Sequence, residues 1–118
     1  MNESLKMAQL AVKALDERKG IDIKVIDISK VSTVADYFII ASGNSKSQVT
    51  ALVDNVEEFF AKEEHNPNQR EGYVTGAWVL LDYVDVVVHV FDKEYRHFYD
   101  LERIWRDGVE VDIEELLK

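Results

Sequence analysis

The sequence has no cysteine, a single proline, and only 14 lysines and arginines against 23 aspartates and glutamates. Without cysteine the chain has no disulfide framework, no thiolate chemistry and no cysteine-ligated zinc, which fits a reducing compartment. The net charge of −9 repels the phosphate backbone of nucleic acids, and no cluster of basic residues offsets it. The sequence therefore argues against direct nucleic-acid binding and favours a basic protein partner.

Long apolar runs and targeting signals are also missing. The apolar stretches fall short of the roughly 18 to 20 residues that span a bilayer. Residues 1–20 have no basic start, no unbroken apolar region and no small-residue cleavage site. We therefore expect no membrane span and no secretion signal, with the cytoplasm as the location. With 47% apolar and 31% charged residues in a chain of 118, the composition is typical of one folded domain over residues 1–118.

Two segments have the spacing of amphipathic helices. Apolar residues recur at helical intervals over residues 4–19, and Gly20 stands where a helix commonly ends. The second segment opens with Ser45 and Gln48 at the spacing of a capping box. Its apolar residues again follow a helical period: Val49, Leu52, Val53, Val56, Phe59 and Phe60. The sequence predicts a helix over each segment.

Strand-like sequence fills much of the remainder. Residues 23–28 and 36–42 are rich in isoleucine, valine and aromatics. Residues 65–72, which contain the proline, lead into one or two strands up to Ala77 and then a hairpin within residues 78–91. Asp92 can then cap a helix whose apolar side holds Tyr95, Phe98, Leu101 and Trp105. Residues 112–118 offer a capping box for a short terminal helix. This order predicts a single mixed β-sheet flanked by helices, an α/β or α+β fold.

The hairpin segment, WVLLDYVDVVVHVF (residues 78–91), sets two aspartates in an otherwise almost wholly apolar run. If the strands pair about residues 83–84, Asp82 opposes Asp85 and like charges meet across the turn. Because faces alternate along each strand, one face is entirely aliphatic and consists of Ala77, Val79, Leu81, Val86, Val88 and Val90. We expect that face to lie in the core.

The other face of the hairpin is mixed and holds Trp78, Leu80, Asp82, Asp85, Val87, His89 and Phe91. In one interpretation a helix of the protein covers it, Trp78 stacks on the opposed His89, and the aspartates only solvate the turn. In another, aromatic anchors beside rim charges form an interaction patch. The composition of this face fits both.

The sequence gives little support for a catalytic function. Asp82 and Asp85 could hold Mg²⁺ or carry acid–base chemistry, and the turn GNSKS (residues 43–47) could hold an anion at a helix start. There is no glycine-rich phosphate loop and no obvious serine–histidine–acid arrangement, and the three histidines lack metal-ligand spacing. The leading expectation is therefore a binding protein with no catalytic residue, cofactor or metal. The alternative is a small nucleotide-binding module that uses both aspartates and this turn.

Four blocks of sequence carry a resemblance to a known family: IDIKVIDIS (21–29), ADYFIIASGNSKSQV (35–49), WVLLDYVDVVVHVF (78–91) and YRHFYDLERIW (95–105). Together they resemble the ribosomal silencing factor family, also called RsfS, YbeB or Iojap, over nearly the whole chain. The resemblance implies a cytoplasmic, non-enzymatic factor that is homodimeric when free. It also implies a fold similar to that of nucleotidyltransferases, so the alternative function becomes that of a small nucleotidyltransferase-like, nucleotide-binding module.

The resemblance further implies a partner, large-subunit ribosomal protein fourteen, bound at the face that meets the small subunit. Bound there, the factor would block subunit joining and repress translation when nutrients run short. Carried over by position, the main contacts are Trp78, Leu80, Asp82 and Tyr83. Their neighbours in this surface are Asp85, His89 and Phe91. An acidic chain that docks on a basic ribosomal protein agrees with the net charge.

Two features depart from what the resemblance brings with it. The family usually has glycine where this chain has Val84, and a type I′ turn needs a positive φ that costs a β-branched residue more than glycine. Either the turn is strained or it is a wider loop in the same register. Active nucleotidyltransferases also set their metal-binding acids two apart on one strand, whereas Asp82 and Asp85 are three apart with a turn between them. A similar fold therefore does not imply that activity.

Overall fold

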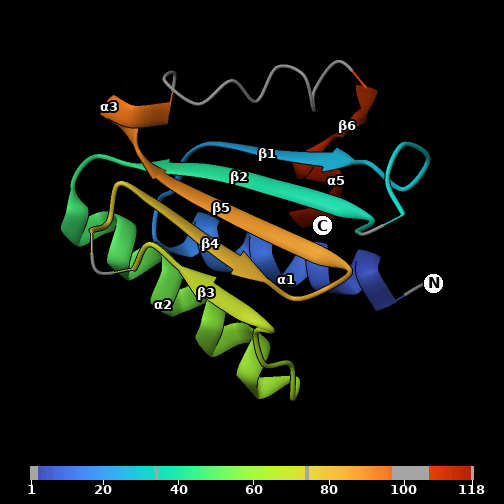
Figure 1. The fold of residues 1–118 in the computed structure, drawn as a ribbon, viewed down its shortest axis with the longest axis horizontal. Helices are drawn as coiled ribbons and strands as arrows, with labels where there is room; N and C mark the ends of the chain where they lie inside the picture. Colours follow the sequence, from blue (N-terminus) through green and yellow to red (C-terminus); the bar gives the residue numbers. More distant parts are fainter. Residues whose placement is uncertain (1–2, 34, 74, 97–106, 118) are drawn as a thin grey trace.

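The protein's structure, a computed structural model, describes residues 3–33, 35–73, 75–96 and 107–117. Its elements along the chain are α1 (Glu3–Glu17), β1 (Ile21–Asp27), β2 (Tyr37–Gly43), α2 (Lys46–Lys62), β3 (Gln69–Glu71), β4 (Trp78–Asp82), β5 (Val86–Asp92), α3 (Lys93–Arg96), β6 (Val109–Val111) and α5 (Ile113–Leu117). The strands form one sheet in the order β3-β4-β5-β2-β1-β6 (Figure 1). Strands β2 and β5 are parallel and the other neighbours are antiparallel, so the predicted mixed sheet is confirmed.

Helices α1 and α2 lie side by side and cover one face of the sheet (Figure 1). Both were predicted, and the start of α2 has the predicted cap. The Ser45 side chain accepts a hydrogen bond from the Gln48 N–H at 3.2 Å, and Gln48 Oε1 accepts one from the Asn44 N–H at 2.6 Å. Asn55 joins the two helices, because its buried Nδ2 donates to the Ala14 carbonyl at 2.8 Å.

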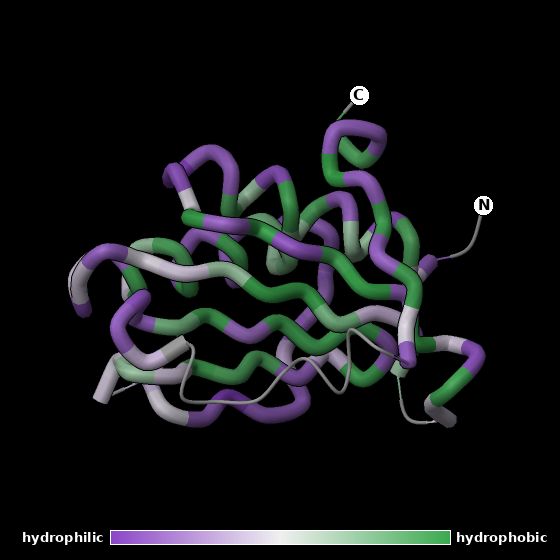
Figure 2. Tube along the Cα trace, turned by 90° about the horizontal axis from the view of Figure 1, so that it is seen from above, coloured by the Kyte–Doolittle hydropathy of each residue, from purple (hydrophilic) through white to green (hydrophobic). Residues whose placement is uncertain are grey.

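The sheet buries apolar side chains on both faces. The larger cluster lies between the sheet and the two long helices, and it includes Val12, Leu15, Ile39, Leu52, Val56, Phe60 and Val88. A smaller cluster on the opposite face consists of Ile26, Ile28, Ala35, Ile40, Val87 and Phe91, with Phe38, Trp78 and Leu80 packed against it. Figure 2 shows this pattern as hydrophobic stretches along the inner strands and as alternating hydropathy along the helices. Burial on both faces explains why β5 reads as a nearly continuous apolar run.

The two ends of the sheet differ in what they carry. The turn between β4 and β5 lies at the end where α1 begins, and α2 begins at the opposite end (Figure 1). Hydrogen bonds through Asp36 link the start of α1 to the β4–β5 turn. The buried Ser4 hydroxyl of α1 donates to Asp36 Oδ2 at 2.8 Å, and the Asp36 N–H donates to the Asp85 carbonyl at 2.8 Å. At the far end, Gly43 pairs with Asp92 in the last register position of β2 and β5.

The C-terminal elements match the sequence in part. Helix α3 starts after Asp92, whose Oδ1 accepts from the Glu94 N–H at 3.1 Å. The predicted apolar residues at 98, 101 and 105 lie outside the described residues. The predicted terminal helix is confirmed as α5, capped by Asp112 Oδ1. The edge strand β6 was not predicted. Within the described ranges, no helix is long and apolar enough to cross a membrane.

Candidate functional site

The β4–β5 hairpin has a different register from the predicted one. The partners lie two positions further along β5 than expected: Trp78 pairs with Phe91, Leu80 with His89 and Asp82 with Val87. The predicted pairs of Trp78 with His89 and of Asp82 with Asp85 are therefore wrong. A shift of two residues keeps every strand side chain on its face, so the division into an aliphatic and a mixed face is confirmed for the residues of β4 and β5.

The geometry of the turn explains the shift. The Tyr83 N–H donates to the Val86 carbonyl at 2.9 Å, and the Asp85 N–H donates to the Tyr83 carbonyl at 2.9 Å. Only Val84 has a positive φ in this turn, at 72°, whereas the predicted type I′ turn needs positive φ at both Tyr83 and Val84. The observed turn thus has one strained residue in place of two. It also takes Asp82 and Asp85 out of direct opposition, where their charges repel.

The aliphatic face of the hairpin is fully buried in the larger core through Val79, Leu81, Val86, Val88 and Val90. Ala77, just before β4, is half-buried. Tyr83 extends this face into the turn: its side chain is 5% exposed, and its ring lies 4.2 Å from that of Phe60 in an edge-on arrangement. Burial raises the pKa of the Tyr83 phenol. Tyr83, which the resemblance placed among the main contacts, is thus a core side chain in the free protein.

The mixed face divides into an accessible part and a buried part. Trp78, Leu80 and Asp82 are half-buried, and Asp85 is exposed. His89 is 6% exposed and Phe91 is fully buried. These two predicted neighbours therefore lie beneath the accessible side chains rather than beside them. The alternation of the sequence assigned all of them to one face but did not rank their burial.

A hydrogen bond and three stacked rings join the aromatic residues of this face. Trp78 Nε1 donates to His89 Nδ1 at 3.1 Å. The Trp78 ring stacks on those of His89, at 5.9 Å, and Phe91, at 5.4 Å, while Phe38 meets His89 edge-on at 5.2 Å. Burial lowers the pKa of His89 to about 4, so this imidazole is neutral at pH 7. Because Nδ1 accepts, the proton is on Nε2.

The two aspartates have different roles in the free protein. Asp82 Oδ1 accepts a hydrogen bond from the Val84 N–H at 2.8 Å and so holds the turn. The Asp85 carbonyl accepts from the N–H groups of Asp36 and Tyr37, at 2.8 Å and 3.2 Å, which fixes the turn to the start of β2. The Asp85 residue is exposed, and its carboxylate extends from an anchored backbone. Each acid retains oxygen lone pairs that can accept from a partner's Arg or Lys.

The nucleotide-binding alternative needs groups that the structure keeps apart. The GNSKS turn follows the C-terminal end of β2, where Gly43 pairs with Asp92, whereas Asp85 precedes the N-terminal end of β5. The length of β5 separates the two places, roughly 20 Å at about 3.3 Å per residue. Among the side chains that the structure describes, no His, Asp and Glu residues gather in groups of three or more that could hold a metal ion. The structure therefore does not assemble the site of this alternative.

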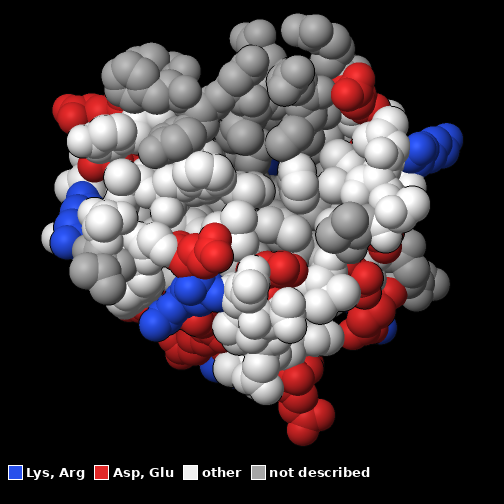
Figure 3. Space-filling model, viewed as in Figure 1, with Lys and Arg blue, Asp and Glu red and all other residues white. Residues whose placement is uncertain are grey.

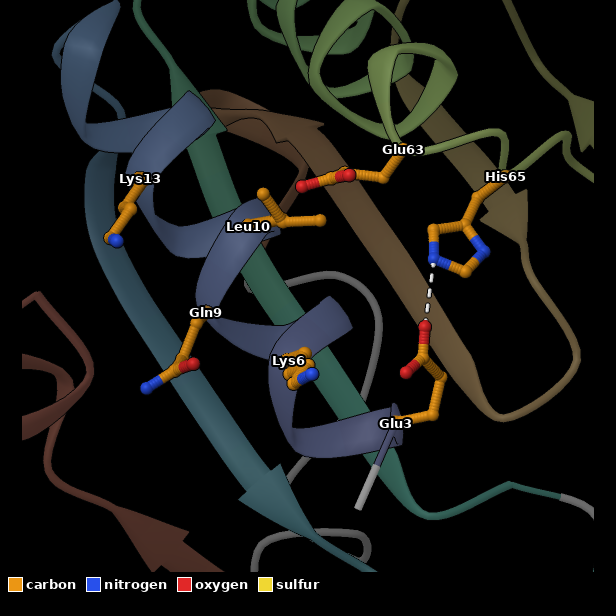
Figure 4. A pocket seen from close by; sticks show the side chains of 7 residues that line it. All are labelled: Glu3, Lys6, Gln9, Leu10, Lys13, Glu63 and His65. Atoms are coloured by element: carbon orange, nitrogen blue, oxygen red, sulfur yellow. Dashed lines mark ion pairs between the residues drawn. The ribbon is translucent and has the colours of Figure 1, made fainter. Parts of the chain in front are cut away.

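A groove of about 360 Å³ lies away from the hairpin, between the first turns of α1 and the end of α2 (Figure 4). It is lined by Glu3, Lys6, Gln9, Leu10, Lys13, Glu63 and His65. His65 Nε2 lies 3.3 Å from Glu3 Oε1, and Leu10 projects toward the centre (Figure 4). The lining side chains carry charges of both signs, and the carboxylate of Glu3 already lies against His65. The groove therefore selects no ligand charge, and it contains none of the predicted contact residues.

The distribution of charge agrees with the acidic composition. Figure 3 shows acidic side chains at several places on the visible face, with the few basic ones scattered among them. Arg70 is one example of a basic residue engaged by its own chain, since its Nη1 lies 3.0 Å from Glu57 Oε1 and its guanidinium sits over the Tyr73 ring at 4.2 Å. Among the described residues, Figure 3 thus shows no basic patch on this face that would bind a phosphate backbone.

Comparison with known proteins gives matches in sequence and in structure. The family described as "Ribosomal silencing factor during starvation" (RsfS) matches residues 1–118. The chain is 37% identical to the ribosomal silencing factor RsfS of Halalkalibacterium halodurans over 112 residues, which are 95% of this chain and 96% of that protein. Identity to the factor of the same name from Bacillus subtilis is also 37%, over 114 residues, 97% of this chain and 96% of the other. A crystal structure of a protein from Chromobacterium violaceum, 37% identical, superposes with a TM-score of 0.85 and covers 89% of this chain and 88% of its own.

Proposed function

This chain belongs to the RsfS family of ribosomal silencing factors, and from that membership we propose that it represses translation by binding the large ribosomal subunit. The partner is ribosomal protein fourteen of that subunit, at the face that meets the small subunit. A folded chain docked there occupies the space that the small subunit needs. Repression is then stoichiometric and steric, with no bond made or broken, and it takes place in the cytoplasm during starvation.

The observation that carries this proposal is the accessible part of the mixed hairpin face, which we call the hairpin surface: Trp78, Leu80, Asp82 and Asp85. The aliphatic face of the same two strands is buried in the core, so the backbone that presents these side chains is fixed before any partner arrives. A fixed backbone lowers the entropic cost of binding. Trp78 offers a large contact area with only two rotatable bonds, and tryptophan is enriched among residues that dominate binding energy.

The charges support a basic partner. Asp82 and Asp85 are the acidic residues of the hairpin surface, and each carboxylate can accept a charge-assisted hydrogen bond from Arg or Lys. The net charge of −9 adds a long-range attraction to a positively charged surface, which raises the association rate at low salt. We therefore expect binding to weaken as the salt concentration rises.

Co-sedimentation with purified large subunits tests the proposal. Trp78→Ala should weaken binding about 30-fold, which corresponds to roughly 2 kcal/mol for a central anchor. Asp85→Arg should weaken it about tenfold by placing a positive charge against a basic partner. The matched control is Asp16→Arg, which makes the same charge change at an exposed position near the other end of α1. Wild-type protein that fails to sediment with large subunits, or equal binding by all four proteins, would contradict the proposal.

The steric mechanism has its own measurement. Light scattering of mixed small and large subunits reports their joining, and an excess of the wild-type chain over large subunits should suppress it. Trp78→Ala at the same concentration should leave joining intact. If the chain binds large subunits and joining still proceeds, occlusion is the wrong mechanism even though binding is right.

We also infer that the free chain forms a homodimer, and that the hairpin surface contributes to it. A half-buried tryptophan and leucine on one patch are the kind of apolar area that association covers. Dimer formation and ribosome binding would then compete by mass action. Sedimentation velocity over a range of concentrations measures the dimer. A covalently locked dimer that binds large subunits as tightly as the monomer contradicts the competition.

A further inference from the structure

We propose that His89 is a positioning residue for the hairpin surface: it holds the Trp78 indole in the single orientation that a partner meets. The inference rests on the proposed function, because it assigns Trp78 to the contact. His89 itself is 6% exposed, so a rigid partner does not reach it. Its effect on binding therefore passes through the tryptophan.

Stacking on Phe91 and His89 does not by itself fix the indole. The Trp78 ring lies against the rings of Phe91, at 5.4 Å and 21° between planes, and His89, at 5.9 Å and 29°. Such contacts are available to either face of the indole, and the χ2 torsion of tryptophan is broad and roughly two-fold. The hydrogen bond from Trp78 Nε1 to His89 Nδ1, at 3.1 Å, forms in only one of the two orientations. Among these contacts, the hydrogen bond to His89 is the one that distinguishes the two orientations.

The identity of residue 89 is not explained by packing. Within the described part of the chain, His89 Nε2 is buried and has no hydrogen-bond partner. Leaving a buried donor unpaired costs about 1–3 kcal/mol. A phenylalanine ring would fill the same place without that cost and would keep the T-shaped contact with Phe38, whose ring centroid lies 5.2 Å from that of His89. What histidine adds at this position is the Nδ1 acceptor for Trp78.

Two substitutions separate the ring from the acceptor. His89→Phe keeps a ring and removes the acceptor, whereas His89→Asn keeps an oxygen near the position of Nδ1 and removes most of the ring. Stability should depend on the presence of the ring, so His89→Phe should unfold at a higher urea concentration than His89→Asn. The affinity for large subunits should depend instead on the hydrogen-bond acceptor at position 89. At equal concentrations of folded protein, His89→Phe should bind about tenfold more weakly than wild type, and His89→Asn should lie between them.

A third variant controls for loss of stability alone. Ile40 is fully buried and pairs with His89 across β2 and β5, but it offers no acceptor. Ile40→Val should lower stability and leave binding of the folded protein unchanged. If binding by the three variants falls in the order of their stabilities, the role of His89 is structural and the inference is overturned.

A measurement without ribosomes keeps the inference separate from the proposed function. The indole N–H of Trp78 gives an NMR signal, assigned by its loss in Trp78→Phe. Its exchange with solvent should be slow in wild type and Ile40→Val, and at least tenfold faster in His89→Phe as the hydrogen bond is lost. Unchanged exchange in His89→Phe overturns the inference. Failure of the wild type to bind large subunits overturns the proposed function instead, and the exchange result still decides whether His89 holds the indole.

Discussion

Glycine at position 84 should be tolerated far better than glycine at a comparable valine elsewhere, because Val84 is held in a strained backbone conformation. Val84 has φ = 72° at the tip of the hairpin. In this left-handed region the Cβ of an L-residue crowds the following carbonyl, at a cost of roughly 1–2 kcal/mol. Glycine has no Cβ, so Val84→Gly removes that cost from the folded state.

Val31 provides the matched comparison. Each of these valines is 55% exposed, so the loss of side-chain burial is similar at the two positions. Glycine also gives the unfolded chain more freedom, worth about 0.4–1 kcal/mol, and this term too is shared. The difference between the free energies of unfolding of the two glycine variants therefore reports the backbone strain at Val84. Val84→Gly should therefore have a free energy of unfolding about 1–2 kcal/mol above that of Val31→Gly, a difference of roughly 4 °C in Tm for each kcal/mol.

Urea unfolding followed by circular dichroism measures the difference, with equal m-values as the condition for comparing the two proteins. Asparagine tests the cause, since it tolerates positive φ better than other side chains. Val84→Asn should also be more stable than Val31→Asn. Equal stabilities within each pair would refute the reasoning, because they would mean that the turn carries no strain at this residue.

Three further predictions concern buried groups. Asn55→Ala removes the bonds from Nδ2 to the Ala14 carbonyl and to Glu17 Oε1 and should cost about 1–3 kcal/mol in urea unfolding. Phe60→Ala empties a fully buried site and should cost about 3–5 kcal/mol by the same measurement; a loss below 1 kcal/mol would contradict its place in the core. Burial lowers the pKa of His89 from 6.5 to about 4, so the unfolded chain binds a proton at this imidazole at a higher pH than the folded chain does. The stability linked to the neutral imidazole is therefore complete above pH 6.5 and is lost as the pH falls toward 4. Between about pH 7.5 and 5.5 the wild type should therefore lose roughly 1.4 kcal/mol more stability than His89→Phe, and parallel curves would argue against a neutral, buried imidazole.

The elements that the sequence predicted are those specified by local rules. The spacing of apolar residues and the box of Ser45 and Gln48 depend on residues within a few positions of one another, and α1 and α2 were found where expected. The faces of the hairpin follow from strict alternation, which survives a register shift of two. In contrast, β6 is a three-residue edge strand with exposed or half-buried side chains, and such a segment has no pattern to recognise.

The register and the strand order could not be read in the same way. The register of the β4–β5 hairpin depended on backbone strain at Tyr83 and Val84 and on repulsion between Asp82 and Asp85. The periodicity of apolar residues carries no information about either effect. Strand order depends on the parallel pairing of β2 with β5, whose partners are far apart in sequence. For the site, the sequence placed the side chains on one face but left their depth open. Burial of His89 and the hydrogen bond that it accepts from Trp78 became visible only with the packing of both faces.

The two-sided burial of the hairpin bears directly on how it can act. Its aliphatic face is held by the core, and its turn is fixed to β2 through the Asp85 carbonyl and held by the Asp82 side chain. A segment restrained in this way cannot fold around a partner, so its contacts must already be in place in the free protein. Affinity then depends on a few pre-oriented side chains rather than on induced order. This is why the orientation of one indole should change binding tenfold while the fold remains intact.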